Sequence, residues 1–274
     1  MHLRVGDRSF PVACSSWSFA CLPLEAAIRI VRLLGFGHID IGFGHLPREG
    51  LASPRSQGRL LRKRLSREGL KASDIFPLLP FETNDLDVRH REENTRTVRA
   101  VLELAEGCGA PGVTLKPGIA QPAAQDGGWR ASLDALMEYV ALARMAGVGL
   151  SVEPYVDSIV EDPRAALRLV ESVPGLELTL DYSHFVSLGY EIGDLRHLQS
   201  YARHVHVRQA SRGRLQASAR NGVIPLLRIL EELAARGYGG AVSLEYQNSD
   251  WHGMNDIDVI TETVATLRQL GLRK

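Results

Sequence analysis

Short apolar runs alternate along the chain with longer segments whose apolar residues recur every three or four positions. The short runs lie at residues 11–15, 38–42, 70–76, 112–116, 148–153, 176–181, 204–208 and 241–246. The longer segments include 24–34, 93–108, 131–146 and 225–236, which have the spacing of amphipathic helices. This order of strands and helices predicts parallel strands joined by crossover helices.

Glycine marks the predicted ends of these helical segments. Gly35, Gly107, Gly147 and Gly237 each stand where the helical pattern gives way to the next strand. Glycine takes the left-handed backbone conformation that commonly ends a helix, so these positions are predicted helix stops.

The order of the elements predicts one closed barrel. No linker rich in proline or serine divides the chain, so we expect residues 1–274 to form a single domain. Eight strand–helix units that close on themselves give an α/β fold of the (β/α)8 TIM-barrel class, whose active sites lie at the carboxyl ends of the strands. A doubly wound open sheet is the alternative, but CSSWSFACLP follows the first strand where that fold has a glycine-rich phosphate turn.

Composition narrows the classes of partner. Thirty-two basic residues balance thirty-two acidic ones, which leaves no overall positive charge to attract nucleic acid. No apolar run reaches the roughly 18 to 20 residues that span a bilayer, and the first ten residues lack the apolar core of a secretory signal. We therefore expect a cytoplasmic protein with a small-molecule partner and no nucleic-acid or membrane partner. The three cysteines lack CxxC spacing and indicate neither a disulfide framework nor a zinc ribbon. A homo-oligomer is left open.

Each of the last four predicted strands ends in an acidic or histidine side chain. Because side chains alternate between the two faces of a strand, one face carries polar pairs: Ser151 with Glu153, Thr179 with Asp181, His204 with His206, and Ser243 with Glu245. The other face is almost entirely Val, Leu or Ile and should pack on the helices, so the polar face points into the barrel. Buried charges are costly unless something compensates them. The pattern predicts one divalent metal ion held by Glu153, Asp181, His206 and Glu245.

Three carboxylates and one imidazole form an oxygen-rich ligand set with a single nitrogen. Such a set favours Mn²⁺, with Mg²⁺, Co²⁺ and Zn²⁺ as alternatives. His204 lies two residues deeper than His206, and we expect it to be a hydrogen-bonded interior histidine rather than a ligand. Asp40 is a candidate hydrogen-bond acceptor behind the ligands.

Four sequence runs carry this pattern: SVEPY, LTLDYSHF, HVHVRQASRGRLQ and GYGGAVSLEYQ. They resemble the sugar phosphate isomerase/epimerase family of xylose isomerase-like TIM barrels, a superfamily that also holds ketose 3-epimerases and endonuclease IV. The resemblance covers about residues 10–270 and is most specific over 149–247. It implies that Glu153, Asp181, His206 and Glu245 bind one metal, and that the two glutamates flank the substrate carbon as acid and base.

The resemblance implies a metal-dependent isomerase or epimerase of a sugar, a sugar phosphate or a related polyhydroxy carbonyl compound. The metal would polarise the carbonyl and stabilise the enediolate, while Glu153 and Glu245 move protons on opposite faces. The alternative enzyme is a metal-dependent dehydratase of the inosose or dehydroshikimate type, which would expel a hydroxyl instead. A barrel that binds a sugar without catalysis is the third possibility.

The resemblance also indicates substrate-binding residues. His184, three residues beyond Asp181, and Arg212, six beyond His206, match positions that hold substrate oxygens in the epimerases. Ketose epimerases have a further glutamate where this chain has Ile159, which disfavours a free ketohexose as substrate. Endonuclease IV fits less well, because its three-metal site needs many more histidines.

Further candidates come from the residues alone. Lys116, at the end of the fourth predicted strand, is a candidate for binding a substrate carboxylate or phosphate, with a lysine that reaches solvent as the alternative. Trp17 and Phe76 are candidates for an apolar wall against a sugar, or else belong to ordinary barrel packing. Arg212 and two further arginines make the loop after the seventh strand basic, which suits an anionic substrate.

Overall fold

Eight parallel strands close into a barrel in the computed structural model, which describes residues 1–46, 53–120 and 125–273. Pairing of β11 with β2, and of β2 with β3, leaves the barrel without a free edge. The predicted closed barrel is therefore confirmed, and the open sheet is excluded. The barrel strands are β2 (Arg8–Ser15), β3 (His38–Gly42), β4 (Lys71–Phe76), β5 (Gly112–Leu115), β6 (Gly149–Val152), β7 (Glu177–Asp181), β8 (Ala202–Val207) and β11 (Val242–Leu244).

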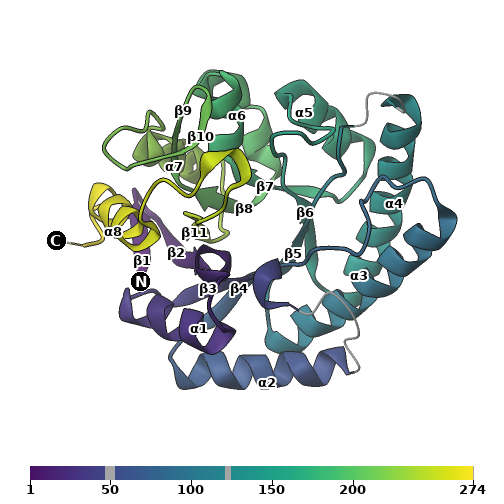
Figure 1. Ribbon diagram of the computed structural model, residues 1–274, viewed down its shortest axis with the longest axis horizontal. Helices are drawn as coiled ribbons and strands as arrows, with labels where there is room; N and C mark the ends of the chain where they lie inside the picture. The colour runs from purple at the N-terminus through teal and green to yellow at the C-terminus, as the bar shows by residue number, and fades with distance from the viewer. Residues whose placement is uncertain (47–52, 121–124, 274) are drawn as a thin grey trace.

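A helix follows each barrel strand and lies on the outside of the barrel (Figure 1). The helices are α1 (Leu24–Leu33), α2 (Pro54–Arg67), α3 (Val88–Cys108), α4 (Gln125–Ala146), α5 (Pro163–Ser172), α6 (Tyr182–Leu188), α7 (Leu226–Ala235) and α8 (Val259–Gln269). Three of the predicted stops follow helix ends with positive φ, namely Gly35, Gly147 and Gly237.

Two antiparallel additions decorate the barrel. The strand β1 (His2–Val5) pairs with β2, and β9 (Gln209–Ser211) pairs with β10 (Arg214–Ala217) in a hairpin that follows β8. Among the described residues, every helix is too short or too polar to cross a membrane.

The two faces of the barrel strands differ in polarity, as their alternation predicts. Val152, Leu180 and Val205 are buried in one continuous hydrophobic core together with residues of the surrounding helices. Burying apolar surface between strands and helices stabilises the fold by roughly 25 cal/mol per Å². The polar residues of the strands lie on the face that points into the barrel.

The deeper part of the barrel interior is a closed polar network. Thr114 Oγ1 donates to Asp74 Oδ2 at 2.5 Å and lies 2.7 Å from Thr179 Oγ1. Arg203 Nη2 donates to Asp74 Oδ1 at 2.7 Å and to Ser151 Oγ at 2.7 Å. These groups satisfy one another, so the network stabilises the barrel and leaves chemistry to the layer above it.

The helix stop predicted at Gly107 is wrong. The helix α3 continues past this residue, and Gly109 caps it with a φ of +76°. Gly107 instead allows α2 and α3 to approach closely, because a Cβ there would collide with the carbonyl oxygen of Arg55. A Cβ at Gly58 of α2 would collide with the carbonyl oxygen of Leu104 in the same way. Both glycines are therefore packing residues.

Replacing Gly58 by alanine should destabilise the protein. The added methyl group must push α3 away from α2, which costs about 1 to 3 kcal/mol, and urea unfolding measures the loss. Gly193→Ala is the control, because a Cβ there meets no atom within 4 Å. The control should change the free energy of unfolding by less than about 0.5 kcal/mol. Equal effects at the two positions would contradict the close approach of α2 and α3.

Candidate metal centre

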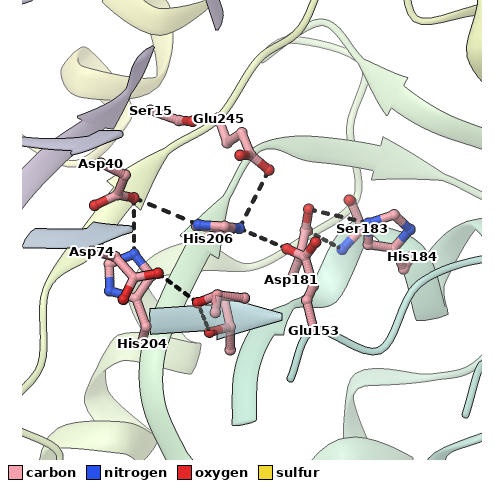
Figure 2. Close-up of polar contacts among 12 residues, drawn as sticks. Ser15, Asp40, Asp74, Glu153, Asp181, Ser183, His184, His204, His206 and Glu245 are labelled. Carbon is pink, nitrogen blue, oxygen red and sulfur yellow. Dashed lines mark hydrogen bonds and ion pairs between the residues drawn. The ribbon is translucent and has the colours of Figure 1, made fainter. Parts of the chain in front are cut away.

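Four side chains meet at the carboxyl-terminal mouth of the barrel. Glu153 follows β6, Asp181 ends β7, His206 lies near the end of β8, and Glu245 follows β11. The register of β7 and β8 places Asp181 directly beside His206. All four residues are buried, with 1% to 4% of their surface exposed. Figure 2 shows them turned toward one another.

His206 lies at the centre of this cluster. Its Nδ1 is 2.6 Å from Glu153 Oε1 and 3.3 Å from Glu245 Oε2. These three residues form one group in which candidate ligand atoms lie within 4.8 Å of one another. Asp181 belongs to a second such group, with Glu153 and His184. Because the two groups share Glu153, the four predicted ligands form one continuous cluster.

A buried arginine lies inside the cluster. Arg208 Nη2 is 2.8 Å from Asp181 Oδ2, and Arg208 Nε donates to Ser183 Oγ at 2.7 Å. Burial opposes ionisation of Asp181, but Arg208 holds the pKa of this carboxyl below its usual value. Arg208 is not among the residues predicted from the sequence, although HVHVR places it on the same side of the chain as His204 and His206.

A layer of polar residues supports His206 from deeper in the barrel. Asp40 Oδ2 lies 2.9 Å from His204 Nε2 and 3.5 Å from His206 Nε2, while Asp40 Oδ1 accepts a hydrogen bond from Ser73 Oγ at 2.5 Å. His204 is thus a hydrogen-bonded interior histidine, as expected. Since Nε2 of His206 faces Asp40, its Nδ1 is the nitrogen that faces the carboxylates. A carboxylate behind a histidine is the usual support for a metal-binding imidazole.

Burial and neighbouring charges shift the pKa values within the cluster. Burial raises the pKa of Glu245 to about 7. The negative charge of Glu153 also raises this pKa, while His206 lowers it. Burial opposes the charged form of His206, yet Glu245 and Glu153 raise its pKa well above the ordinary value. Burial lowers the pKa of His184 to about 4, so this ring is neutral at pH 7.

The donor chemistry of the cluster fits one divalent cation. Carboxylate oxygens and an imidazole nitrogen are ligands that Mg²⁺, Mn²⁺ and Zn²⁺ accept. Three buried carboxylates carry three negative charges, of which the Arg208 guanidinium balances one. An ion with two positive charges would bring the group to neutrality with His206 uncharged. Glu153, Asp181, His206 and Glu245 are the residues that would hold it.

The cluster borders a small cavity of about 190 Å³. Three of the predicted substrate-binding residues, Trp17, Lys116 and His184, line this cavity. Arg212 does not line it: this residue is exposed in the turn between β9 and β10, where its side chain lies close to Gly189. A role for Arg212 in binding substrate remains a prediction.

A larger cavity of about 680 Å³ opens at the other end of the barrel. Lys71, Arg203 and Gly240, near the starts of strands, contribute to its lining. The carboxylates of the candidate centre do not reach it. We place the functional site at the carboxyl mouth, where barrel enzymes have their active sites.

Fold and site together define a class of protein: a (β/α)8 barrel with acidic and histidine side chains gathered at the ends of its last four strands. The profile of the xylose isomerase-like TIM barrel family matches residues 28–270, and the chain belongs to that family. The resemblance noted in the sequence motifs is thereby confirmed. No curated protein matches the chain.

Several solved structures share the fold. L-ribulose 3-epimerase superposes with a TM-score of 0.76 at 21% identity, covering 95% of this chain and 94% of its own. A xylose isomerase-like TIM barrel protein from Mycobacterium smegmatis in complex with magnesium has a TM-score of 0.72 at 21% identity, with 96% and 97% covered. IolI protein with a bound zinc atom has a TM-score of 0.74 at 18% identity, with 95% and 98% covered. At these identities the likeness shows the fold.

Metal binding should strengthen as the pH rises. In the metal-free protein Glu245 has a pKa of about 7 and His206 a pKa well above its ordinary value, so an entering ion must displace protons. The apparent Kd for Mn²⁺ should therefore fall between roughly pH 6 and pH 8. Isothermal titration calorimetry in buffers of different ionisation enthalpy measures both the Kd and the protons released. A pH-independent Kd without proton release would contradict this assignment of ligands.

Proposed function

We propose that the protein is a metal-dependent isomerase or epimerase of a sugar or a related polyhydroxy carbonyl compound. The observation that carries the proposal is the placement of Glu153 and Glu245 beside the same nitrogen of His206, bordering a cavity. Two carboxylates on one substrate carbon allow a proton to leave on one side and return on the other. Membership of the xylose isomerase-like family supports the same chemistry.

The two glutamates would transfer protons between a carboxylate oxygen and the carbon next to the carbonyl. Glu245 suits this task because it is buried at the edge of the cavity, where its carboxylate can reach a bound substrate. When bound, a divalent ion supplies a Lewis acid that polarises the neighbouring carbonyl. The ligand set favours Mn²⁺ in our proposal, with Mg²⁺, Co²⁺ and Zn²⁺ as alternatives.

The walls of the cavity suit a small sugar-like molecule. The rings of Trp17 and Phe76 meet edge to face at 6.3 Å, and those of Tyr155 and Trp251 do so at the same distance. Aromatic rings offer an apolar surface for the C–H groups of a sugar. A volume of about 190 Å³ is below the roughly 300 to 1,000 Å³ of typical ligand sites, which favours a small substrate.

A cytoplasmic location and the lack of a nucleic-acid partner remain predictions from the sequence.

Proton exchange in deuterated water tests the proposal. The Mn²⁺-loaded protein, incubated with a panel of ketoses and keto sugar acids, should introduce deuterium next to the carbonyl without loss of water, as measured by mass spectrometry. Glu153→Gln and Glu245→Gln should each lower the exchange rate by about 10²- to 10⁴-fold, because each removes a base. Glu177→Gln is the control, since this carboxyl lies by the cavity at the other end of the barrel and should not affect exchange.

The other outcomes assign the protein differently. Irreversible formation of an unsaturated product would make it a dehydratase. Binding of metal and sugar without exchange or product would leave a catalytically silent sugar-binding barrel. Undiminished exchange in both glutamine variants would remove Glu153 and Glu245 from the chemistry.

A further inference from the structure

Three polar groups that line the cavity lack a polar partner among the described residues. Lys116 Nζ forms no ion pair in this part of the chain. The side-chain oxygen of Gln247 and the hydroxyl of Tyr155 are buried and form no hydrogen bond there. Buried polar groups are nearly always paired in native proteins. Two such buried groups and the half-buried ammonium of Lys116, all unpaired among the described residues, indicate a ligand in the cavity that supplies their partners.

Lys116 is held in place at the edge of this cavity. It follows β5, and Thr83 Oγ1 donates a hydrogen bond to its carbonyl oxygen at 2.6 Å. Its Nζ lies 5.1 Å from the ring centroid of Tyr155, which lines the same cavity. An ammonium group over an aromatic ring is stabilised there and has given up part of its hydration. The positive charge of Lys116 is therefore presented to the cavity.

The charges around the cavity leave Lys116 without a counter-charge. With a divalent ion bound, the three carboxylates of the cluster are balanced by that ion and by the Arg208 guanidinium, which is 2.8 Å from Asp181. Lys116 then adds one positive charge that no described carboxylate pairs with. A neutral sugar offers this half-buried ammonium only hydroxyl oxygens, whereas a substrate with one negative charge would form an ion pair with it.

The unpaired charge selects a carboxylate over a phosphate. A phosphate monoester carries close to two negative charges and three acceptor oxygens at neutral pH. Among the described residues that line the cavity, Lys116 is the one cation without an ion pair, since Arg208 is paired with Asp181. Asp181 already caps the nearby N-terminus of α6 by accepting the Ser183 N–H at 2.8 Å. The Lys116 ammonium, the Gln247 amide and the Tyr155 hydroxyl together suit a ligand that has one carboxylate next to hydroxyl groups.

Building on the function proposed above, we propose that the substrate is a small sugar acid. Its carboxylate binds the Lys116 ammonium. The side-chain amide of Gln247 and the hydroxyl of Tyr155 bind the neighbouring oxygens. These three residues determine specificity, and the glutamates perform the proton transfer.

Calorimetry on the Mn²⁺-loaded protein tests this inference with unreactive probes. D-gluconate carries a carboxylate and hydroxyls but no carbonyl, and D-glucitol is the neutral polyol of the same length. The protein should bind D-gluconate about tenfold or more tightly than D-glucitol, because a hydrogen bond to a charged group contributes that much. Lys116→Met should abolish this preference while the Kd for Mn²⁺ stays unchanged. Lys71→Met, an equal change of charge at an exposed residue by the other cavity, should keep it.

Several results would overturn the inference. Equal affinity for the two probes, or an unchanged preference in Lys116→Met, would remove Lys116 from substrate recognition. Tighter binding of D-glucitol 6-phosphate than of D-gluconate would assign the site to a phosphate. Gln247→Leu and Tyr155→Phe keep the inference testable if Lys116→Met fails to fold, since each should weaken D-gluconate binding several-fold.

Failure of this inference can be told apart from failure of the proposed function. If the protein exchanges deuterium into a neutral ketose, and Lys116→Met does not change the rate, the protein is an isomerase but its substrate is not a sugar acid. Selective binding of D-gluconate through Lys116, without deuterium exchange into any keto sugar acid, would sustain the binding site and reject the isomerase.

Discussion

The burial of three carboxylates around one imidazole is the constraint on which this structure depends. Glu153, Asp181 and Glu245 are nearly inaccessible to solvent, and an unpaired buried charge costs several kcal/mol even after relaxation. The protein supplies part of the compensation through Arg208, and it orients His206 through Asp40. We propose that a divalent cation supplies the remainder, because a bound cation would also polarise a carbonyl.

The barrel interior contains two separate polar layers, and only the layer at the mouth holds the carboxylate cluster. In the deeper layer Arg203, Asp74 and Thr114 satisfy one another, so that layer supports the strands without needing a ligand. In the layer at the mouth, three buried carboxylates surround His206, and the Arg208 guanidinium pairs with one of them. Neighbouring parallel strands fix the relative positions of Asp181 and His206, and the closed sheet prevents them from drifting apart. The barrel strands thus keep the negatively charged carboxylates close together, whereas residues on a flexible loop would move apart.

Much of this arrangement could be predicted from the sequence because strand alternation is a short-range rule. It placed Glu153 and His206 on the inward face, and the order of the elements predicted the barrel. Contacts between distant segments could not be predicted in the same way. A glycine near the end of a helical pattern, such as Gly107, is typical of a helix stop. The structure shows that Gly107 is a packing residue, because α2 lies directly against it. The pairing of Arg208 with Asp181 depends on the register of two strands, which no local pattern fixes.

Crystals of the protein soaked in Mn²⁺ would test the central claim most directly, through the anomalous scattering of the ion. We predict one peak per chain, about 2.0 to 2.6 Å from His206 Nδ1 and from carboxylate oxygens of Glu153, Asp181 and Glu245. A site without a peak, with the Arg208 guanidinium and a protonated His206 balancing the carboxylates instead, would contradict the account.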